Sequence, residues 1–284
     1  MTTGRIYVHP AMARERFRQL AMMRDEEVDL TEASLVIALE EYPGLQIEPY
    51  LERIHVWTST VRERLGSSRD VERIVDEVNR LLFDEEGFHG EADDYYDPRN
   101  AFLNDVLDRH AGLPIALSIV YIELSRALGI ETSGVALPGH FLVKLSGEWG
   151  DLLIDPFDEG RVLAHDECQE LIDHVFGGAV RLREHHLRSF GNKEILSRLL
   201  SHLKSVYVSR RDPERAAASI DRLLILDDRD PFELHDRARL AMELHQYGVA
   251  IDYLERYLKA SPAADDNRRV RDEIDYLRSW IGAN

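Results

Sequence analysis

His140 and Asp155 are the residues whose types and spacing best fit chemistry. His140 begins the apolar run HFLVKL and Asp155 ends the run DLLID, and the turn-forming segment SGEWG lies between them. Two such runs predict an antiparallel hairpin. A register that pairs Lys144 with Asp151 sets His140 directly opposite Asp155, with Cβ atoms roughly 4.5 to 5.5 Å apart. An imidazole oriented by a carboxylate can serve as a general base.

Few residues of the chain have a side chain that could supply a nucleophile to this pair. Ser118 lies one helical turn after Pro114 and is the candidate, although a serine in a buried helix often donates to a carbonyl one turn earlier. Cys168 is the only cysteine, and we interpret it as a buried, inert thiol. The catalytic candidates are therefore His140, Asp155 and Ser118, and none of them is assigned as a nucleophile.

A second polar group, Arg99, Asn100 and Asn104, follows the sequence DDYYDP. Asn100 and Asn104 fall on one face of a predicted helix. One interpretation is a capped helix with a solvated face. The other is a groove, lined by Arg99, Asn100, Asn104 and His140, that holds a peptide or acyl group with fixed donors.

The elements that must position these residues are mostly helical. Residues 30–44, 47–66 and 71–87 have apolar residues at helical spacing and predict a helical lobe over residues 1–96. A core over residues 97–190 follows, with a small antiparallel sheet built on the hairpin.

Two helices of the core begin with proline in the first turn. One is predicted from Asp97 and Pro98 to a stop near Gly112, because an N-cap residue followed by proline begins a helix. The other begins at Pro114 and ends before Gly129. Apolar residues cover almost every face of this second helix, which indicates burial on all sides.

The C-terminal part, residues 191–284, contains a repeat. Four residues recur 34 positions later, which is the period of tetratricopeptide helix pairs: Ala216, Ile220, Arg222 and Leu224 as Ala250, Leu254, Arg256 and Leu258. Two repeats are too few to be stable alone. We therefore expect the array to pack on the core or to be capped by a last helix around residues 270–281.

Composition excludes several classes of function. The 284 residues include 35 Lys and Arg against 53 Asp and Glu, a net charge of −18 that repels a phosphate backbone. We expect no nucleic-acid partner. No window has the length and hydropathy of a signal peptide or a membrane span, so we expect a cytoplasmic protein without a membrane partner. One cysteine excludes an internal disulfide and a Cys-based zinc site, and we expect neither a metal nor a cofactor.

Several segments resemble one known family. They are EEYPGL, GFHGEADDYYDPRNAFLNDVLDRHAGLPIALS, GVALPGHFLVKL and LLIDPFDEGRVL, followed by the repeats. In this order they resemble the bacterial SirB-type family of transglutaminase-like proteins. The resemblance implies an α+β fold, with a papain-like transglutaminase core, a helical N-terminal lobe and an all-α repeat array.

The resemblance also maps the superfamily's Cys, His and Asp onto Pro114, His140 and Asp155. Proline has no nucleophilic atom, so we expect no Cys-based enzyme activity. The leading hypothesis is a non-catalytic, regulatory protein that binds a protein or peptide through its repeats and core groove. The alternative is a hydrolase or acyltransferase that uses His140 and Asp155 with a non-Cys nucleophile or an activated water. The oligomeric state stays open.

Overall fold

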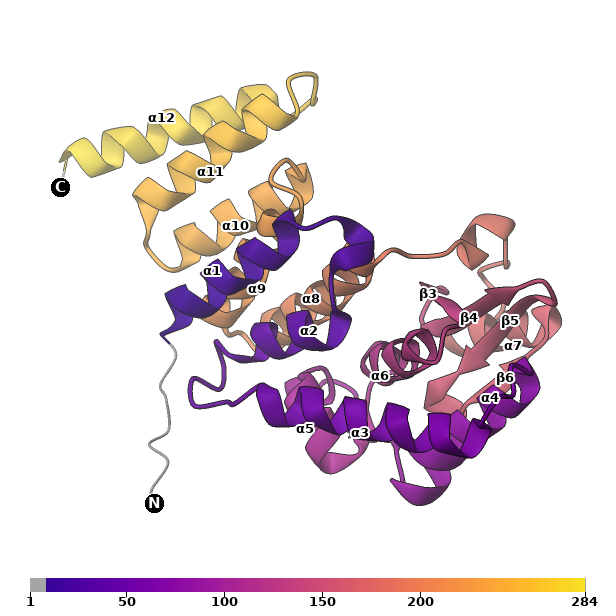
Figure 1. Cartoon of the computed structure of the whole chain (residues 1–284). Helices are drawn as coiled ribbons and strands as arrows, with labels where there is room; N and C mark the ends of the chain where they lie inside the picture. Colours follow the sequence, from indigo (N-terminus) through magenta and orange to yellow (C-terminus); the bar gives the residue numbers. More distant parts are fainter. Residues whose placement is uncertain (1–8, 284) are drawn as a thin grey trace, which may run out of the picture. The chain divides into compact units, whose positions relative to one another are not determined.

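A computed structural model describes residues 9–283, and its internal contacts divide the chain into two compact units (Figure 1). The first unit ends at Leu199 and the second begins at Leu200, inside helix α8 (Asn192–Ser209). The first unit combines helices with a four-stranded sheet, and the second is entirely helical among the residues described. The expected α+β architecture with a following helical array is confirmed.

The predicted helical lobe is present in the first unit. Its helices are α1 (Pro10–Met22), α2 (Leu30–Ala38), α3 (Glu48–Leu65) and α4 (Val71–Asn79), with a short 3-10 turn η1 (Asp25–Glu27) before α2. A π-helical turn, η2 (Arg80–Glu85), continues α4. The predicted pattern over residues 71–87 therefore spans one helix whose hydrogen bonding changes near its end.

The single helix predicted from Asp97 to Gly112 is wrong. A 3-10 turn η3 (Pro98–Asn100) and a separate helix α5 (Leu103–Arg109) replace it, because Phe102 adopts an extended conformation between them. Asn100 and Asn104 consequently do not share one helix face. The chain then forms β2 (Ala111–Gly112), which pairs in parallel with β1 (His89–Gly90).

Helix α6 (Pro114–Ala127) is the centre of the first unit. It contacts helices α2, α3, α4 and α5 and strands β3 and β4. Figure 1 shows α6 between the helices of the lobe and the sheet. Eleven of its residues are buried, so the predicted burial on every face is confirmed. Full burial of one Leu or Ile side chain stabilises a fold by roughly 1.5 to 3 kcal/mol.

The sheet contains four antiparallel strands, in the order β3 (Glu131–Val135), β4 (Leu142–Gly147), β5 (Gly150–Asp155) and β6 (Arg161–Leu163). The 3-10 turn η4 (Pro156–Asp158) follows β5. Helix α7 (His165–Phe176) packs a small apolar cluster against one face, and the 3-10 turn η5 (Glu184–Leu187) leads to α8.

The predicted hairpin exists, but its register is wrong by two positions. Lys144 pairs with Leu153 and Asp151 with Ser146, and the turn is two residues long, between Gly147 and Gly150. His140 precedes β4 and has no directly opposite partner on β5. Since side chains alternate with a period of two, a two-residue error leaves every side chain on its expected face.

The second unit continues from α8 with α9 (Pro213–Leu226), α10 (Pro231–Glu243), α11 (Tyr247–Ala260) and α12 (Asn267–Ala283). Helices α10, α11 and α12 share one core of small and branched residues, which includes Ala238, Ala250, Leu254 and Val270. The expected capping helix is thus α12.

One largely enclosed carboxyl, with a side chain 16% exposed, is expected to make the stability of the first unit depend on pH. Burial raises the pKa of Glu123 on α6 from 4.5 to about 7, and the nearby Asp29 carboxylate adds to the effect, while Arg126 opposes it. The unfolded chain releases this proton at lower pH than the folded protein does. The contribution to stability is therefore complete below pH 4.5 and is lost as the pH rises through about 7.

We expect Glu123→Gln to remove this decline, because the amide stays neutral. The free energy of unfolding of the variant minus that of the wild type should be larger at pH 8 than at pH 4.5. The increase should be roughly 1 to 3 kcal/mol. Urea unfolding at the two pH values measures the difference. Glu131→Gln, at an exposed glutamate of β3, is the control. Equal behaviour of the two variants would contradict the expectation.

Candidate functional site

The structure brings His140 and Asp155 together. The Nε2 atom of His140 lies 2.8 Å from Oδ2 of Asp155. The His140 side chain is 11% exposed and that of Asp155 is 2% exposed. With Nε2 donating to the carboxylate, Nδ1 is left as the ring's acceptor, so the pair retains the arrangement that prepares an imidazole to take up a proton.

Both carboxylate oxygens of Asp155 are engaged. Oδ1 accepts a hydrogen bond from the backbone N–H of Phe157 at 3.0 Å, so Asp155 also caps the turn η4. The backbone N–H of Gly160 donates to the Asp155 carbonyl at 2.9 Å. The carboxylate therefore organises the backbone that follows β5 as well as the imidazole.

Helices α4 and α6 hold this segment in place. The amide of Asn79 donates to the carbonyl of Gly160 at 2.9 Å, and the hydroxyl of the buried Tyr121 donates to Asn79 at 3.0 Å. Gly160 has a φ of 75°, and an added Cβ would lie 2.1 Å from the Asn79 oxygen. Only glycine fits where the Asp155 loop meets α4.

Phe157 completes the site and was missed by the sequence interpretation. Its ring contacts the His140 ring edge to face, with 5.8 Å between centroids. It also covers Gly90, where an added Cβ would lie 2.5 Å from the ring. The signal was present in the sequence: Asp155 and Pro156 repeat the N-cap and proline pattern that begins a helical turn.

Pro114 is the first residue of α6 and is buried. Strand β2 leads into it, and α6 contacts both β2 and the turn η4 that carries Phe157. Helix α6 is therefore packed against the segment that follows Asp155, and the side chain at its first position is a proline ring.

The remaining nucleophile candidates are enclosed. Ser118 is completely buried, and its hydroxyl has no hydrogen-bond partner among the described residues. Cys168 on α7 is also fully buried, and burial, with the nearby carboxylates of Glu167 and Asp155, raises the pKa of its thiol to about 11. A thiol in this state is a poor nucleophile at neutral pH.

The three polar residues of the predicted groove have different surroundings. Arg99 is 57% exposed and pairs with Asp97. Asn100 is fully buried, where it donates to the Asp94 carbonyl at 2.7 Å and accepts from Arg109 at 2.8 Å. Asn104 is buried with a side-chain oxygen that has no partner in the described part of the chain. No hydrogen bond joins any of the three to His140 between residues 9 and 283.

Helix α10 of the second unit borders two hollows. One, of about 400 Å³, lies between α10 and the end of α11 and is lined by Phe232, His235 and Tyr257. The other, of about 510 Å³, lies between α10 and α12 and is lined by His235, Arg239, Arg269 and Tyr276. His235 borders both, and we call the two neighbouring hollows together the recess along α10.

Two further properties concern the described residues as a whole. No helix among residues 9–283 combines the length and apolar character that a membrane crossing requires. Over the same range, no three His, Cys, Asp or Glu side chains are grouped as metal ligands.

Comparison with known proteins places these features in a family. Residues 48–201 match the family described as Transglutaminase-like superfamily, and residues 203–275 match Tetratricopeptide repeat. A UPF0162 protein of Xylella fastidiosa (strain 9a5c) is 36% identical over 261 residues, which cover 91% of this chain and 93% of the relative. The matches confirm the expected order of a transglutaminase-like region followed by repeats.

More distant similarities extend to eukaryotes. F-box only protein 21 of Mus musculus is 34% identical over 132 residues, which cover 42% of this chain and 21% of that protein. A solved structure of menin, titled for its binding site for the Mixed Lineage Leukemia (MLL) protein, aligns with 13% identity and a TM-score of 0.43, over 95% of this chain and 75% of menin. That similarity is too weak to bear on fold or function.

Asp155→Ala should destabilise the first unit strongly, because it leaves two buried donors, on His140 and Phe157, without acceptors. We expect a loss of roughly 2 to 5 kcal/mol in the free energy of unfolding, measured by urea denaturation. Asp151→Ala on the same strand, where the side chain is 57% exposed, should cost less than about 1 kcal/mol. Similar losses in both variants would refute a structural role specific to Asp155.

Cys168 should resist thiol reagents in the folded protein, because its thiol is buried and protonated at neutral pH. With one cysteine in the chain, a colorimetric disulfide reagent reports this site alone. We expect no rapid reaction at pH 7.5 and complete reaction in concentrated urea. A fast reaction without denaturant would show that the thiol is accessible.

Proposed function

Because this chain belongs to the transglutaminase-like superfamily and carries tetratricopeptide repeats, we propose that it acts by binding another protein and not by Cys chemistry. In this proposal residues 191–284 present the recess along α10 to the partner, and residues 1–190 form a core without a nucleophile. Repeat arrays of this kind use extended concave surfaces for binding. The role is regulatory and cytoplasmic.

The observation that carries the proposal is Pro114 at the first turn of α6. Thiol catalysis needs a thiolate that an imidazolium and a helix N-terminus stabilise. Here the imidazole and its orienting carboxylate are present, at 2.8 Å, while the helix begins with a side chain that can neither be deprotonated nor attack. The only thiol of the chain is buried on α7 and has a raised pKa.

The retained pair has a structural use that explains it without catalysis. Asp155 accepts from both His140 and the backbone of Phe157, so it ties the start of β4 to the end of β5. The groove proposed around His140 would then offer a shaped surface. Of the four groove residues, only Arg99 exposes more than half of its side chain, so it is the one best placed to meet a bound peptide.

The full chain, immobilised, should capture one specific partner from a lysate of its own source. Replacing His235 and Tyr276 by Ala should reduce capture at least about tenfold, since exposed Tyr side chains often dominate such interfaces and His235 borders both hollows. Glu52→Ala, at an exposed residue of α3, is the control and should capture normally. No specific partner under several growth conditions, or equal capture by all variants, would count against the proposal.

A hydrolase or acyltransferase remains the alternative, because Asp155 leaves Nδ1 of His140 available as a base. In that case His140 would deprotonate a water or a substrate amine, with Asp155 holding the tautomer. The proposal predicts no turnover of a panel of acyl and amide substrates by the wild type above the level of His140→Ala. Turnover that His140→Ala abolishes while leaving the far-UV circular dichroism unchanged would support the enzyme instead.

A further inference from the structure

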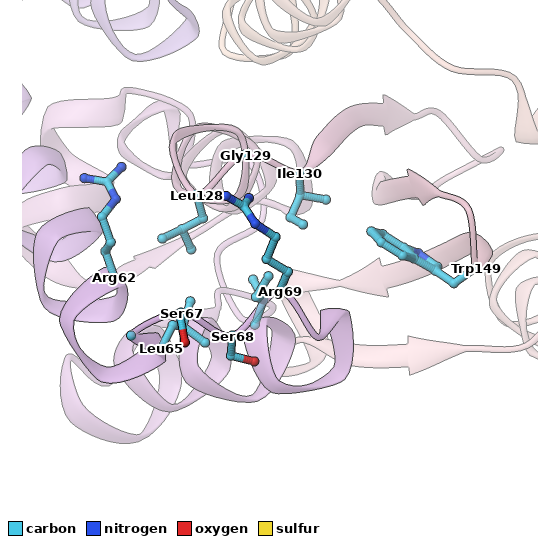
Figure 2. A pocket seen from close by; sticks show the side chains of 11 residues that line it. Arg62, Leu65, Ser67, Ser68, Arg69, Leu128, Gly129, Ile130 and Trp149 are labelled. Carbon is cyan, nitrogen blue, oxygen red and sulfur yellow. The ribbon is translucent and has the colours of Figure 1, made fainter.

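A hollow of about 320 Å³ lies in the first unit at the far end of the β4–β5 hairpin from His140. Its walls come from the end of α3, the loop before α4, the end of α6 and the hairpin turn (Figure 2). The hairpin between Gly150 and Asp155 is extended, so its length separates this hollow from the His140 pair by roughly 17 to 20 Å. A molecule bound in the hollow would not reach His140.

Two arginines line the hollow, and no acidic residue does. Figure 2 shows Arg69 between Arg62 and Trp149. Within residues 9–283 neither arginine has a carboxylate at ion-pair distance, although acidic residues outnumber basic ones in this chain. Arg62 donates one hydrogen bond, to the carbonyl of Ala127 at 2.7 Å. Most guanidinium N–H groups of the two residues are therefore left to bind a ligand.

Ser67 and Ser68 also line the hollow, beside Arg69. Ser68 accepts from the backbone N–H of Asp70 at 3.4 Å, which leaves its own proton free to donate. In Figure 2 both hydroxyl oxygens point away from the guanidinium group of Arg69, so the two arginines are the groups that can share one anion. Two guanidinium groups offer more donors than the two oxygens of a carboxylate can use. They suit a phosphate monoester, with three terminal oxygens and a charge between −1.5 and −2 at about pH 7.

The opposite wall of the hollow is aromatic and apolar. Trp149 is 46% exposed, at the hairpin turn, and its ring covers Gly147, where an added Cβ would lie 2.4 Å from the indole. Glycine at this position lets the ring lie against the strand. Apolar side chains also line the arginine side, where Leu65 and Leu128 lie beside Arg62 (Figure 2). A planar ring bound against Trp149 would gain stacking on the indole, worth roughly 1 to 3 kcal/mol.

We propose that this hollow binds a small phosphate monoester carrying a planar ring, with the phosphate on Arg62 and Arg69 and the ring against Trp149. Its volume is at the lower end of ligand sites, which fits a ligand of the size of a nucleoside monophosphate. A phosphorylated aromatic ring has the same chemistry. The site is independent of the partner recess, so neither proposal depends on the other.

Isothermal titration of the full chain with four probes tests the site: adenosine monophosphate, phenyl phosphate, adenosine and inorganic phosphate. We expect at least one of the ring-bearing phosphates to bind with a dissociation constant below about 1 mM. It should bind at least about tenfold more tightly than adenosine and inorganic phosphate. Adenosine has no phosphate for the arginines, and inorganic phosphate has no ring to stack on Trp149. Tighter binding of adenosine monophosphate would indicate a nucleotide ligand, and tighter binding of phenyl phosphate would indicate a phosphorylated aromatic ring.

Matched variants locate the binding. Arg69→Ala and Trp149→Ala should each weaken it at least about tenfold. Arg271→Ala and Trp280→Ala, at an exposed arginine and a tryptophan of 42% exposure on α12, should bind like the wild type. Far-UV circular dichroism checks that each variant is folded. Arg69→Lys keeps the charge but loses the planar guanidinium, so its affinity should lie between those of the wild type and Arg69→Ala.

Three results would overturn the proposal. The first is no binding of either ring-bearing phosphate below the stated constant. The second is equal binding of inorganic phosphate, which would mark a general anion site. The third is equal loss of binding in the pocket variants and in the α12 variants, which would place the ligand elsewhere.

Discussion

Helix α6 is apolar on all sides, and the first unit is organised by the need to cover it. A helix of this kind is stable in water only when other elements surround it. Here α2, α3, α4 and α5 cover part of its surface and the β3–β4 strands cover another part. The lobe that precedes the core in sequence is thus part of the same folding unit, because it shields the central helix.

The same helix determines what the candidate site can do. It begins at Pro114 and packs against the turn that follows Asp155. Tyr121, about two helical turns after Pro114, donates a hydrogen bond to Asn79. Asn79 in turn donates to the carbonyl of Gly160, in the loop after Asp155. The Asp155 carboxylate is therefore placed through contacts that lead back to the central helix, whose first residue is a proline.

Charge is distributed unevenly over this acidic chain. Many arginines lie beside carboxylates, as Arg14 does with Glu40 and Arg237 with Asp221. Such pairs neutralise local charge but, when exposed, add little stability. The hollow at Trp149 differs because its two arginines face no carboxylate. An acidic surface elsewhere would disfavour extended polyanions, whereas a small anion needs only the local field of such a hollow.

The sequence by itself determined the helical lobe, the buried helix after Pro114, the repeat period and the meeting of His140 with Asp155. These follow from periodicity and capping, which are local. The pairing survived a register error of two residues, because side-chain direction depends on parity and not on the exact partner. The break at Phe102 was not predictable from spacing, and it accompanies a hydrogen bond from the backbone N–H of Leu113 to the Asn100 carbonyl that no local pattern indicates.

Only the tertiary structure decided which side chains meet across distant segments. It placed Phe157 on Gly90, raised the pKa of Glu123 beside Asp29, and gathered Arg62, Arg69 and Trp149 around one hollow. None of these contacts has a local pattern, because each joins residues that are separated in sequence and brought together by packing around α6. The reactive residue types and the local capping patterns could therefore be identified from the sequence. The burial of these residues, and the neighbours that shift their pKa values, depend on the tertiary fold.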